Sequence, residues 1–230
     1  GFTVAVDGAA GQPLVIRAAA GATAAIGGDV RLDGRQHVHV VGLTITGKIK
    51  FNDGRDLAII GNTITTTEDG ITTKTRAERA YIADNVVTGA TAWNEAALGV
   101  SGANVGEGIE VTGPGHVILH NRVRGFRDCV SLLEDSNADE QVAIDIVGND
   151  LSECADDGVE ADFCAHDCRV VGNRLTNTFI ALSSQPGLGG PTYFVRNVVA
   201  NTLLTAFKLQ RGSIGDVLTR FHRMRGYNVL

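Results

Sequence analysis

The sequence predicts an all-β fold, a parallel β-helix in which the chain winds through about seven to eight coils. Two short alternations of apolar and polar residues recur with a base period near 24 residues, and no helical period separates them. Glycine is frequent, at 29 of 230 residues, whereas aromatic residues make up only 5%. This composition is typical of many short, aliphatic strands joined by tight turns.

The first repeated element is an alternating apolar segment that ends in asparagine. It occurs at 57–62, 80–85, 117–121, 145–149, 169–173 and 193–197, and an earlier copy at 37–42 lacks the asparagine. The asparagines are 23, 36, 28, 24 and 24 residues apart. Short strands repeated at this spacing predict coils of about three strands each, stacked about 4.8 Å apart.

The recurring asparagine is predicted to have a structural role at a corner of each coil. Its amide can bond the equivalent groups of the coils on either side, and asparagine tolerates the left-handed conformation that such a turn needs. We therefore expect six asparagines to line up along a common axis of the solenoid: Asn62, Asn85, Asn121, Asn149, Asn173 and Asn197.

A second alternating element follows about eight residues after each asparagine. Its copies are 69–73, 107–111, 128–132, 157–161, 179–182 and 206–209, and an insertion at 88–106 lengthens the interval after Asn85. If the apolar positions point inward, the period of two places the alternate positions in one outward column. That predicted column contains Thr72, Glu110, Ser131, Glu160, Ala181 and Lys208.

Several of these segments resemble a known family. Residues 157–162, 171–174, 183–186, 189–197 and 207–209 are similar to bacterial right-handed parallel β-helix repeat proteins of the pectin-lyase-like superfamily, over roughly residues 13–212. The resemblance implies a right-handed solenoid with a polysaccharide groove along one sheet. The superfamily contains lyases, hydrolases, epimerases, isomerases and adhesins, so the resemblance implies no single activity. The polygalacturonase and alginate epimerase signatures are missing, apart from the pair Asp156–Asp157.

The last part of the chain departs from the repeat. Residues 214–230 resemble a short segment of leucyl-tRNA synthetases, but the His-x-Gly-His signature of those enzymes is absent. Val217, Leu218, Phe221 and Met224 have helical spacing and Gly226 follows as a stop signal. We therefore divide the chain into a β-helix at 1–212 and a helical cap or foreign tail at 213–230, which would cover the last strand edges. An engineered or recombined chain would explain the mismatch.

The charge and hydropathy of the sequence restrict the kinds of binding partner that are expected. The formal net charge is −6 and no dense cluster of basic residues occurs, so nucleic acid is not an expected partner. No apolar run approaches the roughly 18 residues of a membrane span, and the first residues lack the basic flank of a signal peptide. We expect a polysaccharide as partner and a parent protein that is secreted or periplasmic; the oligomeric state stays open.

The four cysteines leave two alternatives open. Cys164 and Cys168 would form a local disulfide in an exported protein and stay free thiols otherwise. With His166 they are too few for a zinc site. Cys129 and Cys154 fall in adjacent coils at non-equivalent positions, so their pairing is undecided.

Two carboxylates predict hydrolase chemistry. Glu110 and Glu160 occupy equivalent positions two coils apart, about 9–10 Å between backbones. Leaning side chains would bring the carboxyl groups within the roughly 6.5–9.5 Å typical of inverting glycosidases. Asp157, which precedes Glu160 in the same segment, is a further catalytic candidate.

The same acidic groups are also compatible with a lyase. Asp128, Asp157 and Asp162 could supply oxygen ligands to Ca²⁺, which would neutralise a uronate carboxylate and acidify its α-proton. Lys208 would then act as the base. Apart from this calcium ion, no cofactor is expected.

The predicted substrate-binding residues surround this face. They are Trp93, Glu107, Arg127 and Gln185, and the long segments 88–106 and 134–141 are the predicted walls of a groove. Trp93 would stack on a sugar ring. The contrasting hypothesis is a non-catalytic solenoid, either an adhesion or scaffold module or a truncated one whose missing coils carried the active site. Outward charges and Asp-Gly turns are common on any solvated strand face.

Overall fold

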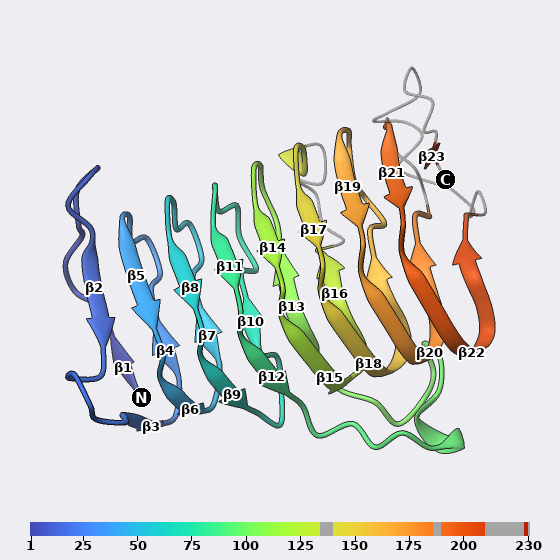
Figure 1. Ribbon diagram of the computed structural model, residues 1–230, viewed down its shortest axis with the longest axis horizontal. Helices are drawn as coiled ribbons and strands as arrows, with labels where there is room; N and C mark the ends of the chain where they lie inside the picture. Colours follow the sequence, from blue (N-terminus) through green and yellow to red (C-terminus); the bar gives the residue numbers. More distant parts are fainter. Residues whose placement is uncertain (134–139, 186–189, 210–227, 230) are drawn as a thin grey trace.

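The computed structural model describes residues 1–133, 140–185, 190–209 and 228–229. These residues form an all-β, parallel solenoid in which short strands from successive windings lie side by side (Figure 1). Within them the only helical element is η1 (Glu95–Ala97), a short 3-10 turn in the insertion that follows Asn85. The prediction of a parallel β-solenoid is confirmed.

The strands belong to two parallel sheets. The first sheet consists of β1 (Phe2–Thr3), β3 (Ala25–Gly27), β4 (Val30–Arg31), β6 (Thr44–Thr46), β7 (Ile49–Lys50), β9 (Thr63–Thr65), β10 (Ile71–Thr72), β12 (Val86–Thr88), β13 (Glu107–Val111), β15 (Arg122–Phe126), β16 (Asp128–Leu132), β18 (Asp150–Glu160), β20 (Arg174–Ser183) and β22 (Val198–Lys208). The second sheet consists of β2 (Leu14–Arg17), β5 (Val38–Val41), β8 (Ala58–Ile60), β11 (Tyr81–Ala83), β14 (Val117–Leu119), β17 (Asp145–Val147), β19 (Cys168–Val171), β21 (Thr192–Val195) and β23 (Asn228–Val229).

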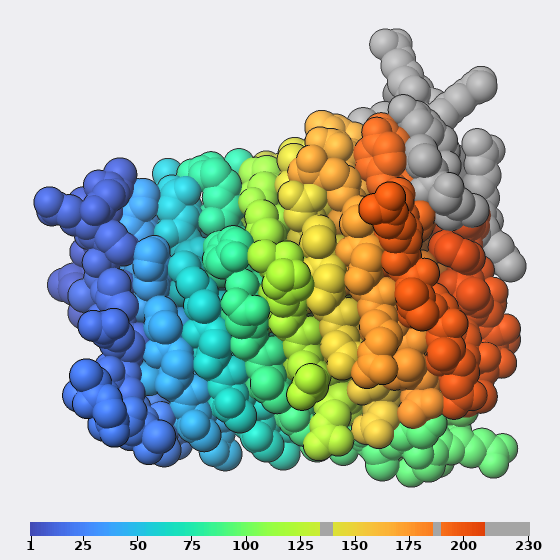
Figure 2. Space-filling view, viewed as in Figure 1, coloured from blue at the N-terminus to red at the C-terminus, as the bar shows by residue number. Residues whose placement is uncertain are grey.

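The first sheet contains two rows of strands. One row runs from β1 to β16 and the other from β3 to β15, and the two meet at β18, which pairs with both β15 and β16. From β18 onward, single long strands continue through the bend between the rows. Together with the second sheet, each winding therefore has three sides. In Figure 2 the windings appear as parallel bands that follow one another from the N-terminus.

The core consists of apolar side chains in register. Ile59 of β8 pairs with Ile82 of β11, which in turn pairs with Ile118 of β14. The same ladder continues through Ile146, Val170 and Phe194. All of these residues are buried. Because the strand period is two, this ladder forces the intervening residues outward, and the predicted alternation follows from that packing.

The asparagine ladder is confirmed. Each asparagine donates both its backbone N–H and its side-chain Nδ2 to the side-chain oxygen of the next, as in Asn85 to Asn121 at 3.0 and 2.9 Å. The ladder runs unbroken from Asn62 to Asn197. Each Nδ2 also donates a second hydrogen bond to a strand carbonyl, as Asn85 does to Ile59 and Asn121 does to Ile82.

The predicted left-handed conformation lies one residue earlier than expected. Positive φ occurs at the residue before each asparagine, for example Gly61 (φ 65°), Asp84 (φ 57°) and His120 (φ 55°). The asparagines themselves have no positive φ. The hydrogen bonds predicted for the asparagine are therefore confirmed. The prediction that the asparagine itself adopts the left-handed conformation is wrong, because the preceding residue does so.

The C-terminal segment is described only in part. The predicted cap helix at 217–225 lies outside the described residues. Asn228 and Val229 form β23, which pairs in parallel with Thr192 and Tyr193 of β21 and extends the second sheet. The division at residue 212 stays a prediction. No helix in the described part of the chain is long and apolar enough to span a membrane.

Candidate functional site

One column of polar residues crosses successive strands of the first sheet. The backbone register aligns, in order, Thr72, Glu110, Ser131, Glu160, Ser183 and Lys208. Glu110 and Glu160 are therefore two windings apart at equivalent positions, as predicted. Lys208 lies two windings beyond Glu160 in the same column, also as predicted.

One member of the predicted column is wrong. Ser183, and not Ala181, aligns with Glu160, and Ala181 is fully buried. The pairing of β18 with β20 contains a register shift, because β18 has one more residue than β20 between matched positions. Since Ile180, Ala181 and Leu182 are three consecutive apolar residues, a period of two could not determine which of them faced outward.

Glu110 is held by polar groups of the preceding winding. Its side chain is almost completely buried, accepts a hydrogen bond from Thr72 Oγ1 at 3.0 Å and forms an ion pair with Lys74. Lys74 Nζ also lies 3.5 Å from Asp69. Burial raises the pKa of Glu110, and the opposing attraction of Lys74 only partly offsets this effect. Glu110 is thus a fixed carboxyl group with a cation beside it.

Glu107 and Asp128 form a second carboxyl pair. They are register partners on β13 and β16, so their side chains start from equivalent positions on neighbouring strands. Burial, with the negative charges of Glu110 and Glu160, raises the pKa of Glu107 to about 8. Burial also raises the pKa of Asp128, which is 1% exposed. Two adjacent carboxyl groups in this environment cannot both ionise easily, so the pair retains a proton near neutral pH.

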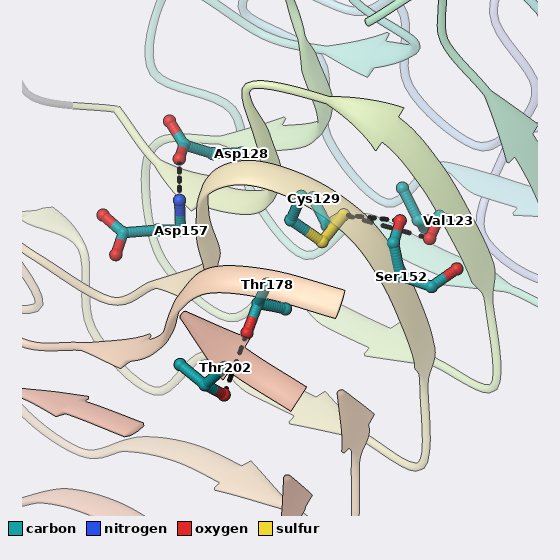
Figure 3. The surroundings of a disulfide bond; sticks show 8 residues. Val123, Asp128, Cys129, Ser152, Asp157, Thr178 and Thr202 are labelled. Atoms are coloured by element: carbon teal, nitrogen blue, oxygen red, sulfur yellow. Dashed lines mark hydrogen bonds between the residues drawn. A yellow bond between two sulfur atoms is a disulfide. The ribbon is translucent and has the colours of Figure 1, made fainter. Parts of the chain in front are cut away.

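Arg127 is the cation nearest to this pair. Its Nε lies 3.6 Å from Asp128 and 3.9 Å from Asp156, and its backbone N–H donates to Gly106 of the insertion. The Asp128 side chain accepts a hydrogen bond from the backbone N–H of Asp157. Figure 3 shows this bond beside a disulfide of Cys129, the residue that follows Asp128.

Lys208 pairs with two buried carboxylates. Its Nζ lies 2.7 Å from Asp157 and 3.4 Å from Asp162, and Asp162 also accepts hydrogen bonds from the Ser183 hydroxyl and the Gln185 backbone. Burial lowers the pKa of Lys208, but Asp162 and Asp157 raise it by more, so it ends above its ordinary value. Burial raises the pKa of Asp157 to about 7 despite the ammonium group. This cluster ends the column at the last described winding of the first sheet.

A small pocket opens in the middle of the column, with a volume of about 130 Å³. It is lined by Glu107, Glu110, Arg127, Asp128, Ser131, Leu133 and Glu160. Four carboxyl groups, one guanidinium and one hydroxyl thus converge on a single opening. Four of the predicted site residues, Glu107, Glu110, Arg127 and Glu160, line it directly, and so does the predicted metal ligand Asp128.

The other predicted residues lie around this pocket or away from it. Asp157, Asp162, Gln185 and Lys208 form the neighbouring cluster, while Trp93 is half-buried in the insertion. The insertion passes beneath the later windings (Figure 1), where Gly99 donates to Ala155 and packs against Phe179. It therefore borders one side of the face. Most of the other predicted wall, 134–139, lies outside the described residues.

A calcium ion needs several oxygen ligands that meet at one point. Although four carboxyl groups line the pocket, no three His, Cys, Asp or Glu side chains among the described residues are placed so that they could hold one metal ion together. Two of the proposed ligands, Asp157 and Asp162, face the Lys208 ammonium instead. The Asp128 carboxylate already accepts a hydrogen bond from the backbone N–H of Asp157. These residues do not fit a calcium ion in this arrangement.

All four cysteines are paired. Cys129 bonds Cys154, and Cys164 bonds Cys168. The first disulfide joins two neighbouring windings, although Cys129 and Cys154 are not register partners. Cys154 is aligned with Phe126 of β15, and the following residues of β18 pair with β16, which contains Cys129. The second closes the short loop after Asp162, the alternative predicted for an exported protein.

Sequence reasoning missed two relationships in the site. It placed Glu107 among substrate-binding residues and Asp128 among metal ligands, whereas they are register partners that line the same pocket. It also did not identify Lys74 as the ion-pair partner of Glu110. A signal for the first existed, because Glu107 and Asp128 both begin the second repeated element. No pattern indicated the second, because Lys74 lies in a turn beyond the repeat.

The carboxyl pair predicts a dependence of stability on pH. The folded-state pKa of Glu107, about 8, lies above its ordinary value of 4.5. A carboxyl group whose pKa is higher in the folded than in the unfolded state favours folding while it is protonated. This contribution is fully present below the unfolded-state pKa and is lost as the pH rises through the folded-state pKa. We expect the free energy of unfolding to fall by on the order of 4 kcal/mol between pH 5 and 9, because the buried Glu107 carboxyl group ionises in this range.

The matched variants are Glu107→Gln and Glu68→Gln, the latter at an exposed position. Urea unfolding at several pH values should show a shallower decline in Glu107→Gln and an unchanged decline in Glu68→Gln. An equal decline in all three proteins would contradict the assignment.

Comparisons of the chain with protein-family models, with curated proteins and with solved structures found no match. The similarity to the pectin-lyase-like superfamily and that of the tail to leucyl-tRNA synthetases therefore stay predictions.

Proposed function

We propose that this protein is a carbohydrate-active solenoid, related to the pectin-lyase-like β-helices, that hydrolyses a polysaccharide at the pocket on the first sheet. The observation that carries the proposal is the convergence of Glu107, Glu110, Asp128 and Glu160 on one opening of about 130 Å³. Glycoside hydrolysis needs one carboxyl group that donates a proton and one carboxylate that activates water. A pocket that combines buried and more accessible carboxyl groups can supply both.

Glu160 is the proposed base. It lies in the pocket two windings from Glu110, and two coil spacings of about 4.8 Å place the backbones about 9.6 Å apart. The hydroxyl of Ser131 lies between them in the column, where it can bind the attacking water or a sugar hydroxyl. This spacing favours an inverting reaction, in which a water molecule fits between the carboxyl groups.

Hydrolysis is favoured over elimination for two reasons. The lyase hypothesis required Lys208 as a base, but Asp157 and Asp162 hold its ammonium group and keep it protonated. It also required a calcium site that the arrangement of Asp128, Asp157 and Asp162 does not fit. Arg127, Gln185 and Trp93 are proposed to bind the polymer along the face on either side of the pocket.

The two disulfides support a secreted or periplasmic protein, since such bonds persist in oxidising compartments. A polysaccharide substrate would also be encountered outside the cell or in the periplasm.

The test is a panel of neutral, cationic and uronate polysaccharides, assayed for new reducing ends and for the ultraviolet absorbance of an unsaturated product. We expect reducing ends without that absorbance, and a loss of about 10²–10⁴-fold in kcat for Glu160→Gln because the base is removed. Glu68→Gln is the matched control. Full activity of Glu160→Gln would contradict the site, calcium-dependent formation of an unsaturated product would favour a lyase, and no cleavage of any polymer would favour the scaffold.

A further inference from the structure

We propose that the pocket on the first sheet selects a sugar residue that carries a free amino group, so that the substrate class is an amino-sugar polysaccharide rather than a uronate polymer. The proposal rests on the proposed function, because it names the substrate of the same pocket. It differs from the lyase hypothesis, in which a calcium ion would neutralise a uronate carboxylate.

The first support is the charge of the pocket lining. One lining residue, Arg127, is basic, and its Nε also lies 3.9 Å from Asp156, which is outside the lining. Four lining residues carry carboxyl groups: Glu107, Glu110, Asp128 and Glu160. A uronate would bring a further carboxylate into this excess of negative charge, whereas an ammonium group would offset part of it. Burial raises the pKa values of Glu107, Glu110 and Asp128, and an ammonium group would favour their ionised forms.

The second support is the way in which the chain neutralises the carboxyl groups on either side of the pocket. From the preceding winding, the Lys74 ammonium group pairs with Glu110. Beyond the pocket, the Lys208 ammonium group lies 2.7 Å from Asp157 and 3.4 Å from Asp162. The described residues that line the pocket include no lysine. The chain thus supplies an ammonium group on both sides of the pocket and leaves an opening between them.

The third support is the Ser131 hydroxyl group. Ser131 lies between Glu110 and Glu160 in the column, is 3% exposed and lines the pocket. Within the described part of the chain, no residue makes a hydrogen bond with this hydroxyl group. A buried hydroxyl group without a partner is costly unless a ligand or a water molecule satisfies it. It can accept a hydrogen bond from an ammonium group, so a ligand of this kind would satisfy it.

The size of the opening and the distance of the next cation in the column agree with this substrate class. A volume of about 130 Å³ is smaller than the roughly 300–1,000 Å³ of pockets that enclose a whole ligand, so it fits one substituent of a sugar ring. Lys50 is aligned with Thr72 and is therefore two windings, about 9.6 Å, from Glu110. Salt screens most of a surface charge over that distance, so Lys50 does not create a uronate site in the pocket.

The first experiment compares three tetrasaccharides by NMR titration of the wild-type protein at pH 7, where most of a free amino group is protonated. They are built from glucosamine, N-acetylglucosamine and galacturonate, and cleavage of any of them would appear as new anomeric signals. The first two have the same ring and linkage, and differ in that a neutral amide replaces the ammonium group. We expect the glucosamine tetrasaccharide to bind about 10–100-fold more tightly than the N-acetylated one, because charge-assisted hydrogen bonds are stronger, and the galacturonate to bind most weakly.

Matched variants connect this preference with the pocket. Glu160→Gln removes a negative charge from the lining, and Glu68→Gln removes one at an exposed position elsewhere. We expect Glu160→Gln to reduce the preference for glucosamine about tenfold and Glu68→Gln to leave it unchanged. If the wild-type protein binds the glucosamine tetrasaccharide no more tightly than the N-acetylated one, or not at all, the proposal is overturned. The proposed function then stands if any polysaccharide of the panel is cleaved, and is overturned as well if none is.

The second experiment needs no ligand. Ser131→Lys would place an ammonium group of the chain in the pocket, and Ser131→Met would place an uncharged side chain of similar length there. We expect Ser131→Lys to unfold at a higher urea concentration than Ser131→Met, because the surrounding carboxyl groups stabilise an ammonium group. An equal or lower urea midpoint for Ser131→Lys would overturn the preference for a cation. Because this comparison involves no cleavage, it tests the charge of the pocket separately from the proposed function.

Discussion

Replacing Asn121 with alanine is expected to destabilise the solenoid by about 3–5 kcal/mol. The Asn121 side chain accepts from the backbone and side chain of Asn85, and it donates to Ile82 and to Asn149. It is 1% exposed, so water cannot replace these bonds. Its loss leaves the Asn85 backbone N–H and the Ile82 carbonyl unpaired inside the protein.

The matched control is Asn201→Ala. Asn201 is exposed and makes a single side-chain bond to Asn177, in a similar contact between neighbouring windings. Its replacement is expected to cost only about 1–2 kcal/mol, since one exposed hydrogen bond is lost and alanine is placed at positive φ. Urea unfolding followed by circular dichroism measures both. Equal effects of the two variants would show that the ladder is not a source of stability.

Removing the Cys129–Cys154 disulfide with a double serine variant is expected to cost about 3–4 kcal/mol. The bond closes a loop of 25 residues, and the entropy lost by the unfolded chain grows with loop length. The serines also place two hydroxyl groups among fully buried positions. Because Cys129 follows Asp128 directly and Cys154 lies just before Asp156 and Asp157, the pocket should be disturbed as well (Figure 3).

The second disulfide provides the comparison. Cys164 and Cys168 are only 4 residues apart, so the same entropic argument gives about 2 kcal/mol for its removal. Urea unfolding of the two double variants should rank them in that order, and the titration of Glu107 should shift only when Cys129 and Cys154 are replaced. The reverse order of stability would contradict the argument from loop length.

Much of the fold could be predicted because its information is local and repeated. The segments 57–62 and 80–85 show the same alternation and the same final asparagine, and each copy supports the interpretation of the others. The vertical alignment of Glu110 with Glu160 followed from this repetition. The register of Ala181 could not be predicted, because a bulge changes the count of residues without changing the hydrophobic pattern.

The sequence predicted which residues belong to the site better than it predicted which of their side chains pair. Glu107, Glu110, Arg127, Asp128 and Glu160 were all candidates, and the structure brings them to one pocket. Their pairing depends on how side chains from neighbouring windings lean and which counter-ions reach them. Those contacts are set by burial and packing and have no periodic signal in the sequence.

By itself the sequence determined the parallel solenoid, the corner asparagines and the face on which acidic groups gather, since period and spacing are properties of the chain. Only the tertiary structure decided that Lys74 pairs with Glu110, that Lys208 pairs with Asp157 and Asp162, and that burial raises the pKa values of Glu107 and Asp128. The physical reason is that a carboxyl group's charge state depends on its burial and on the charges of other windings, which become its neighbours only when the coils stack.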